Sequence, residues 1–149
     1  MSGVLSPIFE NLKKGENIFR PIPDLDVELH LFYGTFDELN TIDRSINFIF
    51  HDAFSPEVNA ELWSVATFKK LASFCAKDVR LATYCASSKA RAAMAKANWF
   101  IGRAPGALGK REMTIASLNK KQLSSFKQLN KQRLINRFDN GYFTKKNDE

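Results

Sequence analysis

Apolar side chains recur at helical spacing through most of the chain after residue 55. Ser55, Pro56 and Glu57 match the cap, the first helical position and the acidic first turn of a helix. The apolar positions that follow are mostly three or four residues apart, which is the spacing of one helix face. They are Val58, Leu62, Val65, Phe68, Leu71, Ala72 and Cys75. This pattern predicts a helix that buries one face, continued by a second helical stretch around residues 81–85.

Two more helices are predicted further along the chain. Ser87 or Ser88 can cap an alanine-rich segment that ends before Gly102, and alanine is the strongest helix former. A last helix is expected from about Asn119 to Phe138, with Asn140 and Gly141 terminating it. Its apolar side would consist of Leu123, Phe126, Leu129, Leu134 and Phe138.

The first third of the chain shows different patterns. Ser6 and Pro7 predict the start of a short helix that ends near Gly15, and prolines at 21 and 23 predict an extended linker. Residues 26–33 alternate between apolar and polar side chains, as in a half-buried strand. Thr35 and Glu38 form a capping box for the next helix. The apolar run 46–50 fits either a second strand or the end of that helix.

These patterns together predict a mainly α fold of four to six helices, with a small β element near residues 26–50. The 149 residues suffice for one domain with its own core. Within a single domain 1–149 we expect an N-terminal arm (1–25), a small β/α element (26–54), a basic helical core (55–140) and a disordered tail (141–149). No internal repeat or second linker divides the chain.

Charge is distributed unevenly along the sequence. Residues 1–60 contain four Lys/Arg against ten Asp/Glu, a net charge of −6. Residues 61–149 contain eighteen Lys/Arg against six Asp/Glu, a net charge of +12, and the whole chain carries +6. A one-sided basic excess of this kind points to nucleic acid, an anionic surface or a charge-complementary protein.

The candidate nucleic-acid-binding residues are the cations after residue 88. On the predicted last helix, Lys120, Lys127 and Lys131 would share one ridge, and Arg133 and Arg137 would share another. The affinity of such a surface for nucleic acid rises with the number of phosphates that it neutralises. For any single lysine, a solvated helix face is the plainer interpretation. The full set is Lys89, Arg91, Lys96, Arg103, Lys110, Arg111, Lys120, Lys127, Lys131, Arg133 and Arg137.

Residues 103–111 form a glycine-containing basic loop between two predicted helices. The loop lacks the phosphate-loop pattern, because position 104 is alanine and position 111 is arginine. A flexible loop that closes on a backbone phosphate fits better, and an ordinary connection is the alternative. Phe100, just before the loop, is the candidate for stacking on an unpaired base, although burial in the core is the commoner role of such a ring.

The residues that usually signal catalysis form no complete set. His51 and Asp52 are adjacent, but neighbours in sequence usually point apart and no nucleophile motif accompanies them. Cys75 and Cys85 suggest buried free thiols, and Asp24, Asp26 and Glu28 match no cation-binding loop. We therefore expect no enzymatic activity, no cofactor and no metal.

The leading functional hypothesis is a non-enzymatic nucleic-acid-binding protein, for RNA or single-stranded DNA, with low sequence specificity. A nucleocapsid-like or packaging role would combine one domain, a basic surface and an acidic arm. The alternative is an interaction or scaffold module that self-associates through its acidic N-terminal and basic C-terminal parts. A small hydrolase that uses His51 is the third and weakest hypothesis.

The expected setting is cytoplasmic, with nuclear entry left open. No secretory signal precedes residue 10, no window approaches the length of a transmembrane helix, and two cysteines do not make a disulfide framework. We expect no membrane partner.

The arm, with Ile8, Phe9 and Leu12 on one face, is too short to be stable alone, so exchange of the arm between copies predicts a homo-oligomer.

Overall fold

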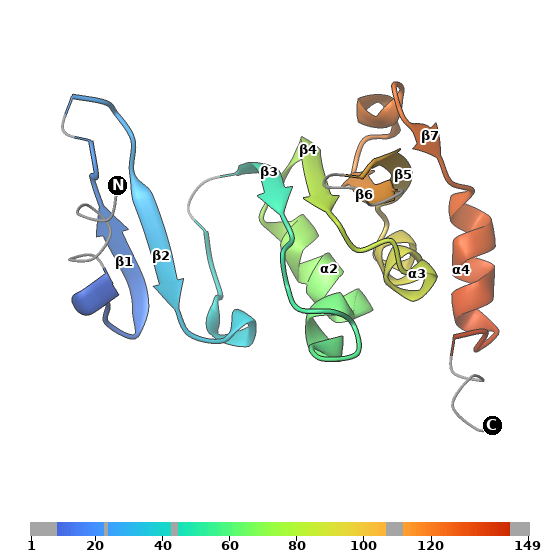
Figure 1. Cartoon of the computed structure of the whole chain (residues 1–149), viewed down its shortest axis with the longest axis horizontal. Coiled ribbons are helices and arrows are strands. Elements are labelled where there is room, and N and C mark those ends of the chain that lie inside the picture. Colours follow the sequence, from blue (N-terminus) through green and yellow to red (C-terminus); the bar gives the residue numbers. More distant parts are fainter. Residues whose placement is uncertain (1–8, 23, 43–44, 107–111, 144–149) are drawn as a thin grey trace. The chain divides into compact units, whose positions relative to one another are not determined.

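The structure is a computed structural model in which the chain divides into two compact units, Met1–Ile42 and Asp43–Glu149 (Figure 1). It describes residues 9–22, 24–42, 45–106 and 112–143. Among these residues, none of the helices has the length and apolar content needed to cross a bilayer.

The first unit contains an antiparallel hairpin. Strand β1 (Gly15–Phe19) pairs with β2 (Leu29–Tyr33), and the register joins Gly15 to Tyr33 and Phe19 to Leu29. The strand predicted within residues 26–33 is thus present as β2. The capping box of Thr35 and Glu38 is also present, but it opens only the short 3-10 helix η1 (Phe36–Glu38).

Gly15 was expected to end a helix, and it begins β1 instead. Its φ of +94° is a conformation that glycine adopts without strain, which suits the sharp entry into the strand. Residues 15–19 of the expected arm are therefore strand, not linker. The predicted start of the first helix, at Ser6 and Pro7, lies outside the described residues.

The second unit contains a five-stranded sheet in the order β3-β4-β6-β5-β7. Strands β3 and β4 are parallel, whereas β6 is antiparallel to both β4 and β5. It follows that β3, β4 and β5 run in the same direction and end at one edge of the sheet. The strands span Ile46–Phe50 (β3), Cys75–Thr83 (β4), Phe100–Pro105 (β5), Glu112–Ser117 (β6) and Lys127–Gln128 (β7).

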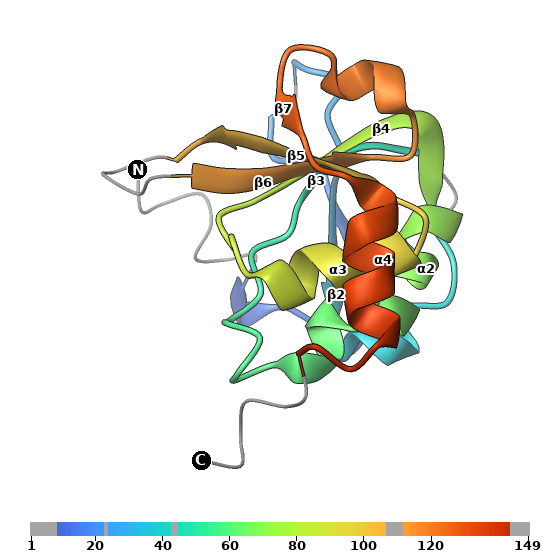
Figure 2. The same cartoon turned by 90° about the vertical axis from the view of Figure 1, so that its right-hand side faces the viewer.

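Three α-helices pack side by side in this unit. Helix α3 (Ser88–Lys96) contacts both α2 (Val65–Ser73) and α4 (Lys131–Asp139), and Figure 2 shows α3 and α4 together beneath strands β5 and β6. Each helix begins at a capping side chain that accepts a backbone N–H bond. The caps are Ser64, Ser87 and Asn130. The 3-10 helices η2 (Ala60–Trp63) and η3 (Lys120–Leu123) complete the unit.

The core of the second unit lies on both faces of the sheet. Phe68 of α2 and Trp99, just before β5, are fully buried and joined, because the Trp99 indole N–H donates to the Phe68 carbonyl at 3.0 Å. A second cluster of Ala82, Ile115 and Leu123 lies where β4 and β6 meet η3. Strand β4 is buried on both faces from Leu81 to Thr83, which accounts for the two clusters.

The prediction of a mainly α fold is wrong, because the chain is an α/β protein. The stretch around residues 81–85, expected to be helical, belongs to β4 and the turn after it. A strand that is buried on both faces has a continuous apolar run without a period of two, so its sequence resembles a buried helix. The expected basic helical core over 55–140 is therefore built around a sheet.

The two C-terminal helices were also predicted too long. Helix α3 ends at Lys96, because Asn98 adopts a left-handed φ of 75° and Phe100 already begins β5. The expected helix 119–138 divides into η3, β7 and α4. Lys120, Lys127 and Lys131 consequently lie on three different elements and share no helical ridge.

Candidate active site

The carboxyl ends of β3 and β4 bring two polar side chains together. The His51 backbone N–H donates to the Ala82 carbonyl at 2.9 Å and extends the parallel pairing beyond β3. Asp52 follows directly, and Tyr84 follows the end of β4. The Tyr84 hydroxyl hydrogen-bonds to the Asp52 carboxylate, and this bond raises the pKa of Tyr84. Both side chains are exposed, so this edge presents an accessible carboxylate beside a phenol that stays protonated.

His51 points the other way, into the core. Its ring lies edge-on to Trp63, with centroids 4.6 Å apart, and 5.4 Å from the ring of Phe68. Burial lowers the pKa of His51, although a hydrogen bond to the Leu62 backbone opposes that shift. The buried Nε2 has no hydrogen-bond partner in the described part of the chain. His51 is therefore a neutral packing residue beneath Asp52, and the two do not form a base and its orienting acid.

Hydrogen bonds from two buried side chains fix the loop after Asp52. The Trp63 indole N–H donates to the Phe54 carbonyl at 2.7 Å, and Thr67 Oγ1 donates to the Glu61 carbonyl at 2.7 Å. Trp63 and Thr67 are both buried. These bonds hold the segment between β3 and α2 against the aromatic core, so that the position of Asp52 is set by packing.

Arg91 braces the turn between β4 and α3. It is 3% exposed, and its Nε donates to Thr114 Oγ1 at 2.9 Å while Thr114 Oγ1 donates to the Cys85 carbonyl at 2.6 Å. Its Nη1 pairs with Glu112 Oε1 at 2.9 Å. A chain of contacts thus connects α3, β6 and the residue after Tyr84.

Glu112 is the centre of a basic cluster. Its Oε2 lies 3.4 Å from Arg103 Nε, and Arg91, Arg103 and Lys127 together lower its pKa, the hydrogen bond from Arg91 contributing most. Of the predicted phosphate ligands, Arg91, Arg103 and Lys127 therefore gather here. Lys110 and Arg111 lie outside the described residues.

The remaining predicted cations are spread over other elements. Lys96 pairs with Asp139 at 2.7 Å, and Arg137 lies 3.9 Å from the ring centre of Tyr142. Lys89 is exposed at the start of α3, Lys120 on η3 and Arg133 on α4. Helix α4 is thus anchored to its neighbours by part of its charge.

Phe100 and Lys131 contact each other. Lys131 Nζ lies 4.4 Å from the centre of the Phe100 ring and donates to Asn98 Oδ1 at 2.6 Å, and burial lowers its pKa. Phe100 is half-buried and packs against the cluster of Ala82, Ile115 and Leu123. One face of the expected stacking residue is therefore covered by a cation.

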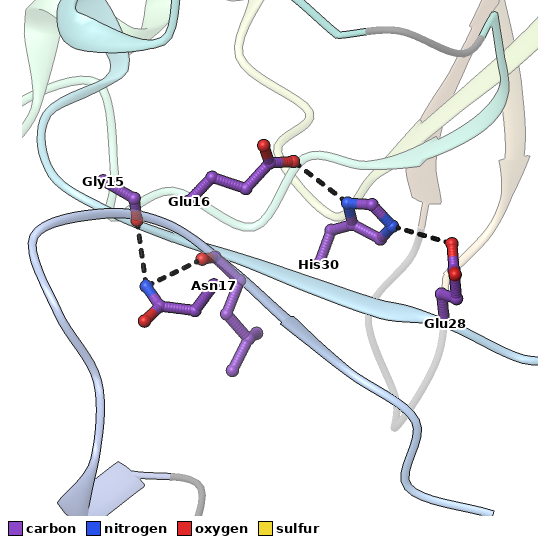
Figure 3. A network of polar contacts seen from close by, with 6 residues as sticks. Gly15, Glu16, Asn17, Glu28 and His30 are labelled. Atoms are coloured by element: carbon purple, nitrogen blue, oxygen red, sulfur yellow. Dashed lines mark hydrogen bonds and ion pairs between the residues drawn. The ribbon is translucent and has the colours of Figure 1, made fainter.

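The described residues contain no group of three or more His, Cys, Asp or Glu side chains placed to hold a metal. The carboxylate of Glu28 contacts Arg20 at 2.9 Å. His30 contacts Glu28 at 3.3 Å and Glu16 at 2.9 Å (Figure 3). Cys75 and Cys85 are free thiols, and burial raises the pKa of Cys75 to about 11.

A sheet whose parallel strands end in polar side chains at one edge is the architecture of α/β proteins that bind their ligands at that edge. The sequence pattern of a family described as S-adenosyl-L-methionine-dependent methyltransferase matches residues 7–119. The chain belongs to this family.

Individual proteins are also similar to parts of this chain. The tRNA 5-methylaminomethyl-2-thiouridine biosynthesis bifunctional protein MnmC of Azoarcus sp. (strain BH72) is 36% identical over 86 residues, which cover 57% of this chain and 14% of that protein. The protein of the same name from Aromatoleum aromaticum is 39% identical over 88 residues, covering 58% and 14%. The chain thus matches about one seventh of the length of these relatives. A crystal structure of MNMC2 from Aquifex aeolicus matches with a TM-score of 0.48 and 25% identity, over 53% of this chain and 25% of that one.

Family membership corrects the functional hypothesis. The chain belongs to an enzyme family, so the prediction of a non-enzymatic, nucleocapsid-like binding protein is wrong. The sequence signal for the site was the apolar run 46–50 followed by Asp52. Interpreted as a strand with a polar residue just after its carboxyl end, that run predicts a ligand site at this end of the sheet.

The family implies S-adenosylmethionine as a cofactor, and the donor set at the sheet edge can be compared with its groups. The Asp52 carboxylate can accept hydrogen bonds from hydroxyl or amino groups, and the Tyr84 hydroxyl lies beside it. Neither the turn after β3 nor the turn after β4 contains glycine, the residue that lets backbone approach a ligand closely. The described residues therefore fit polar contacts to this cofactor, not a glycine-lined cradle for it.

Proposed function

We propose that this chain contributes to an active site that methylates an amine on a uridine of tRNA. The proposal rests on family membership and on the relatives, whose printed name refers to the biosynthesis of a methylaminomethyl uridine in tRNA. The observation that supports it in this chain is the exposed Asp52 carboxylate at the end of β3, hydrogen-bonded to Tyr84.

The chemistry requires a proton acceptor beside the reacting amine. When bound, S-adenosylmethionine supplies a methyl group that is electrophilic because of its sulfonium. An amine attacks only through its lone pair, so Asp52 would accept the proton that the substrate nitrogen must lose. As the new N–C bond formed, the bond between the methyl group and the sulfur would break, and the sulfonium would leave as a neutral thioether. The Tyr84 hydroxyl orients the Asp52 carboxylate, and packing of His51 and Trp63 keeps the loop in place.

The matched substitution Asp52→Asn tests this role. It keeps the shape of the side chain and removes its ability to accept a proton, so methyl transfer to undermodified tRNA should fall by about 10²- to 10⁴-fold. Radiolabelled methyl transfer measures the rate, and fluorescence anisotropy measures tRNA binding, which should be little changed. Glu61→Gln, an exposed acidic residue on η2, is the control and should retain the wild-type rate.

Two results would contradict the proposal. One is a wild-type chain that transfers no methyl group to tRNA above a protein-free blank. The other is an Asp52→Asn variant with the same rate as Glu61→Gln, which would show that the carboxylate at the end of β3 takes no part in the reaction.

A further inference from the structure

Two cations face each other across a pair of strands. In the antiparallel pairing of β5 with β7, Arg103 lies directly opposite Lys127. Like charges at directly opposed positions destabilise a sheet, so this arrangement opposes folding instead of supporting it. Strand β7 has only two residues and lies at the edge of the sheet, which leaves both cations accessible.

The same face of the sheet also bears Glu112 and Thr114. The β5–β6 register pairs Arg103 with Thr114 and Pro105 with Glu112, and alternate residues of a strand share a face. Arg91 reaches Thr114 and Glu112 from α3, so this is the face on which α3 packs. Arg91, Arg103 and Lys127 therefore surround one carboxylate on one surface.

One carboxylate does not balance three cations. Arg91 occupies Glu112 Oε1, and the Nε of Arg103 lies nearest to Oε2. In the part of the chain that the structure describes, Lys127 makes no ion pair and Arg103 makes none besides the contact through Nε. Arg103 is 42% exposed, so its terminal nitrogens can reach an external anion. Arg91 is buried and positions Glu112, while Arg103 and Lys127 present the excess charge.

Arg103 and Lys127 lie across the sheet from Asp52, because β4 and β6 separate β3 from β5 and β7 is the outer strand opposite to β3. Strands β3, β4 and β5 run in the same direction, so Asp52, Tyr84 and the residues of β5 after Arg103 lie at the same end of the strands. The bond from Thr114 Oγ1 to the Cys85 carbonyl links the segment after Tyr84 to Arg91, and Arg91 in turn contacts Glu112 of the cluster. An anion held at Arg103 and Lys127 would belong to the molecule that presents its reactive group to Asp52.

We infer that Arg103 and Lys127, supported by Glu112 and Arg91, form a binding site for backbone phosphates of the RNA whose base is methylated at Asp52. The inference rests on the proposed function and names the contact that holds the substrate strand. A guanidinium and an ammonium opposite each other suit the oxygens of a phosphodiester, and binding relieves the repulsion between them. An acidic polypeptide could also meet this charge, but it would have no reason to lie beside a methyl-transfer site.

The test compares three charge-neutralising substitutions in the full chain. Lys127→Gln and Arg103→Gln remove cations of the cluster, and Lys69→Gln removes an exposed cation of α2 as the control for net charge. Binding of a fluorescein-labelled tRNA transcript is measured by anisotropy across a KCl series. Each cluster variant should reduce the slope of log affinity against log salt by about 0.7 to 0.9, and Lys69→Gln should leave it unchanged. Thermal unfolding should show Lys127→Gln to be at least as stable as the wild type, because a repulsive pair is removed.

The outcomes separate this inference from the proposed function. One outcome is that the wild type binds tRNA and transfers methyl groups while the cluster variants show the same slope of log affinity against log salt as Lys69→Gln. In that case the inferred phosphate site is wrong and the proposed function stands. If the wild type does not bind tRNA, both are wrong. Poly-L-glutamate is the competing probe, and a loss of affinity for it in Lys127→Gln, with unchanged tRNA binding, would assign the cluster to an acidic protein instead.

Discussion

The hydroxyl of Tyr84 hydrogen-bonds to the carboxylate of Asp52 and so joins the ends of two parallel strands of the sheet. Each residue follows its strand within two positions, and each side chain points away from the core. The pairing depends on β3 and β4 ending at one edge, so it is a product of the sheet topology and not of any local motif. A phenol in this position limits the directions in which the carboxylate can accept a proton.

Tyr84→Phe should therefore slow methyl transfer without weakening tRNA binding. The substitution keeps the ring and removes the hydroxyl that bonds to the Asp52 carboxylate. Because Tyr84 is 50% exposed and water can replace the phenol, we expect a decrease in kcat of at most about tenfold. Tyr33→Phe, in the exposed strand β2, is the matched control. Equal rates for the two variants would show that the phenol does not orient Asp52.

The sequence predicted correctly those elements whose signal lies within a few neighbouring residues. The alternation within residues 26–33 predicted β2, and the capping box of Thr35 and Glu38 formed as expected. Ser87 caps α3 as predicted, whereas the helix expected from Ser55 begins only at its cap Ser64. In each case the predictive signal is contained within a few neighbouring residues, so no tertiary information is needed.

The sheet and its site depend on contacts between distant residues, which a single sequence does not reveal. Strand β4 reads as a helix because it is buried on both faces, and β5 was merged with α3 because the turn at Asn98 carries no glycine. The ion pair of Arg91 with Glu112 turned a predicted phosphate ligand into a buried brace. The positions of Asp52 and Tyr84 follow from strand order alone.

The burial of His51 predicts that the second unit loses stability in mild acid. Burial lowers the pKa of His51 in the folded state below its usual value near 6.5, so the unfolded chain binds more protons as the pH falls. The contribution of His51 to stability is fully present above about pH 6.5 and is lost as the pH falls through the pKa of the folded state. Over this range the free energy of unfolding changes by at most about 1.4 kcal/mol per pH unit. Urea unfolding followed by fluorescence of the adjacent Trp63 measures it. His51→Gln should flatten the profile, and an unchanged profile would assign the effect to other groups.

His30, in the first unit, should titrate in the opposite direction. Hydrogen bonds to Glu16 and then to Glu28 raise its pKa, because both carboxylates favour the protonated ring. Its contribution to the β1–β2 hairpin is therefore present below about pH 6.5 and is lost as the pH rises through the folded pKa. Ring-proton NMR of the two histidines should give a midpoint above 6.5 for His30 and below 6.5 for His51. Glu16→Gln should move the His30 midpoint back toward 6.5, and a midpoint that stays in place would mean that this contact does not form in solution.

Gly102 should not tolerate even one additional methyl group. It lies in β5 opposite Ile115, and a Cβ there would be 3.0 Å from Ile115 Cγ2 and 3.2 Å from the Cβ of Phe126. The Phe126 atom adjoins the backbone and cannot turn away, so Gly102→Ala should destabilise the second unit by about 1–3 kcal/mol in urea unfolding. Ile115→Ala removes one of the two contacts, and the double variant should therefore lose less stability than the sum of the single variants. Strict additivity would show that the strand relaxes without pressing on Ile115. Because Gly102 immediately precedes Arg103, a strand displaced by the new methyl group should also weaken tRNA binding, which the same anisotropy assay measures.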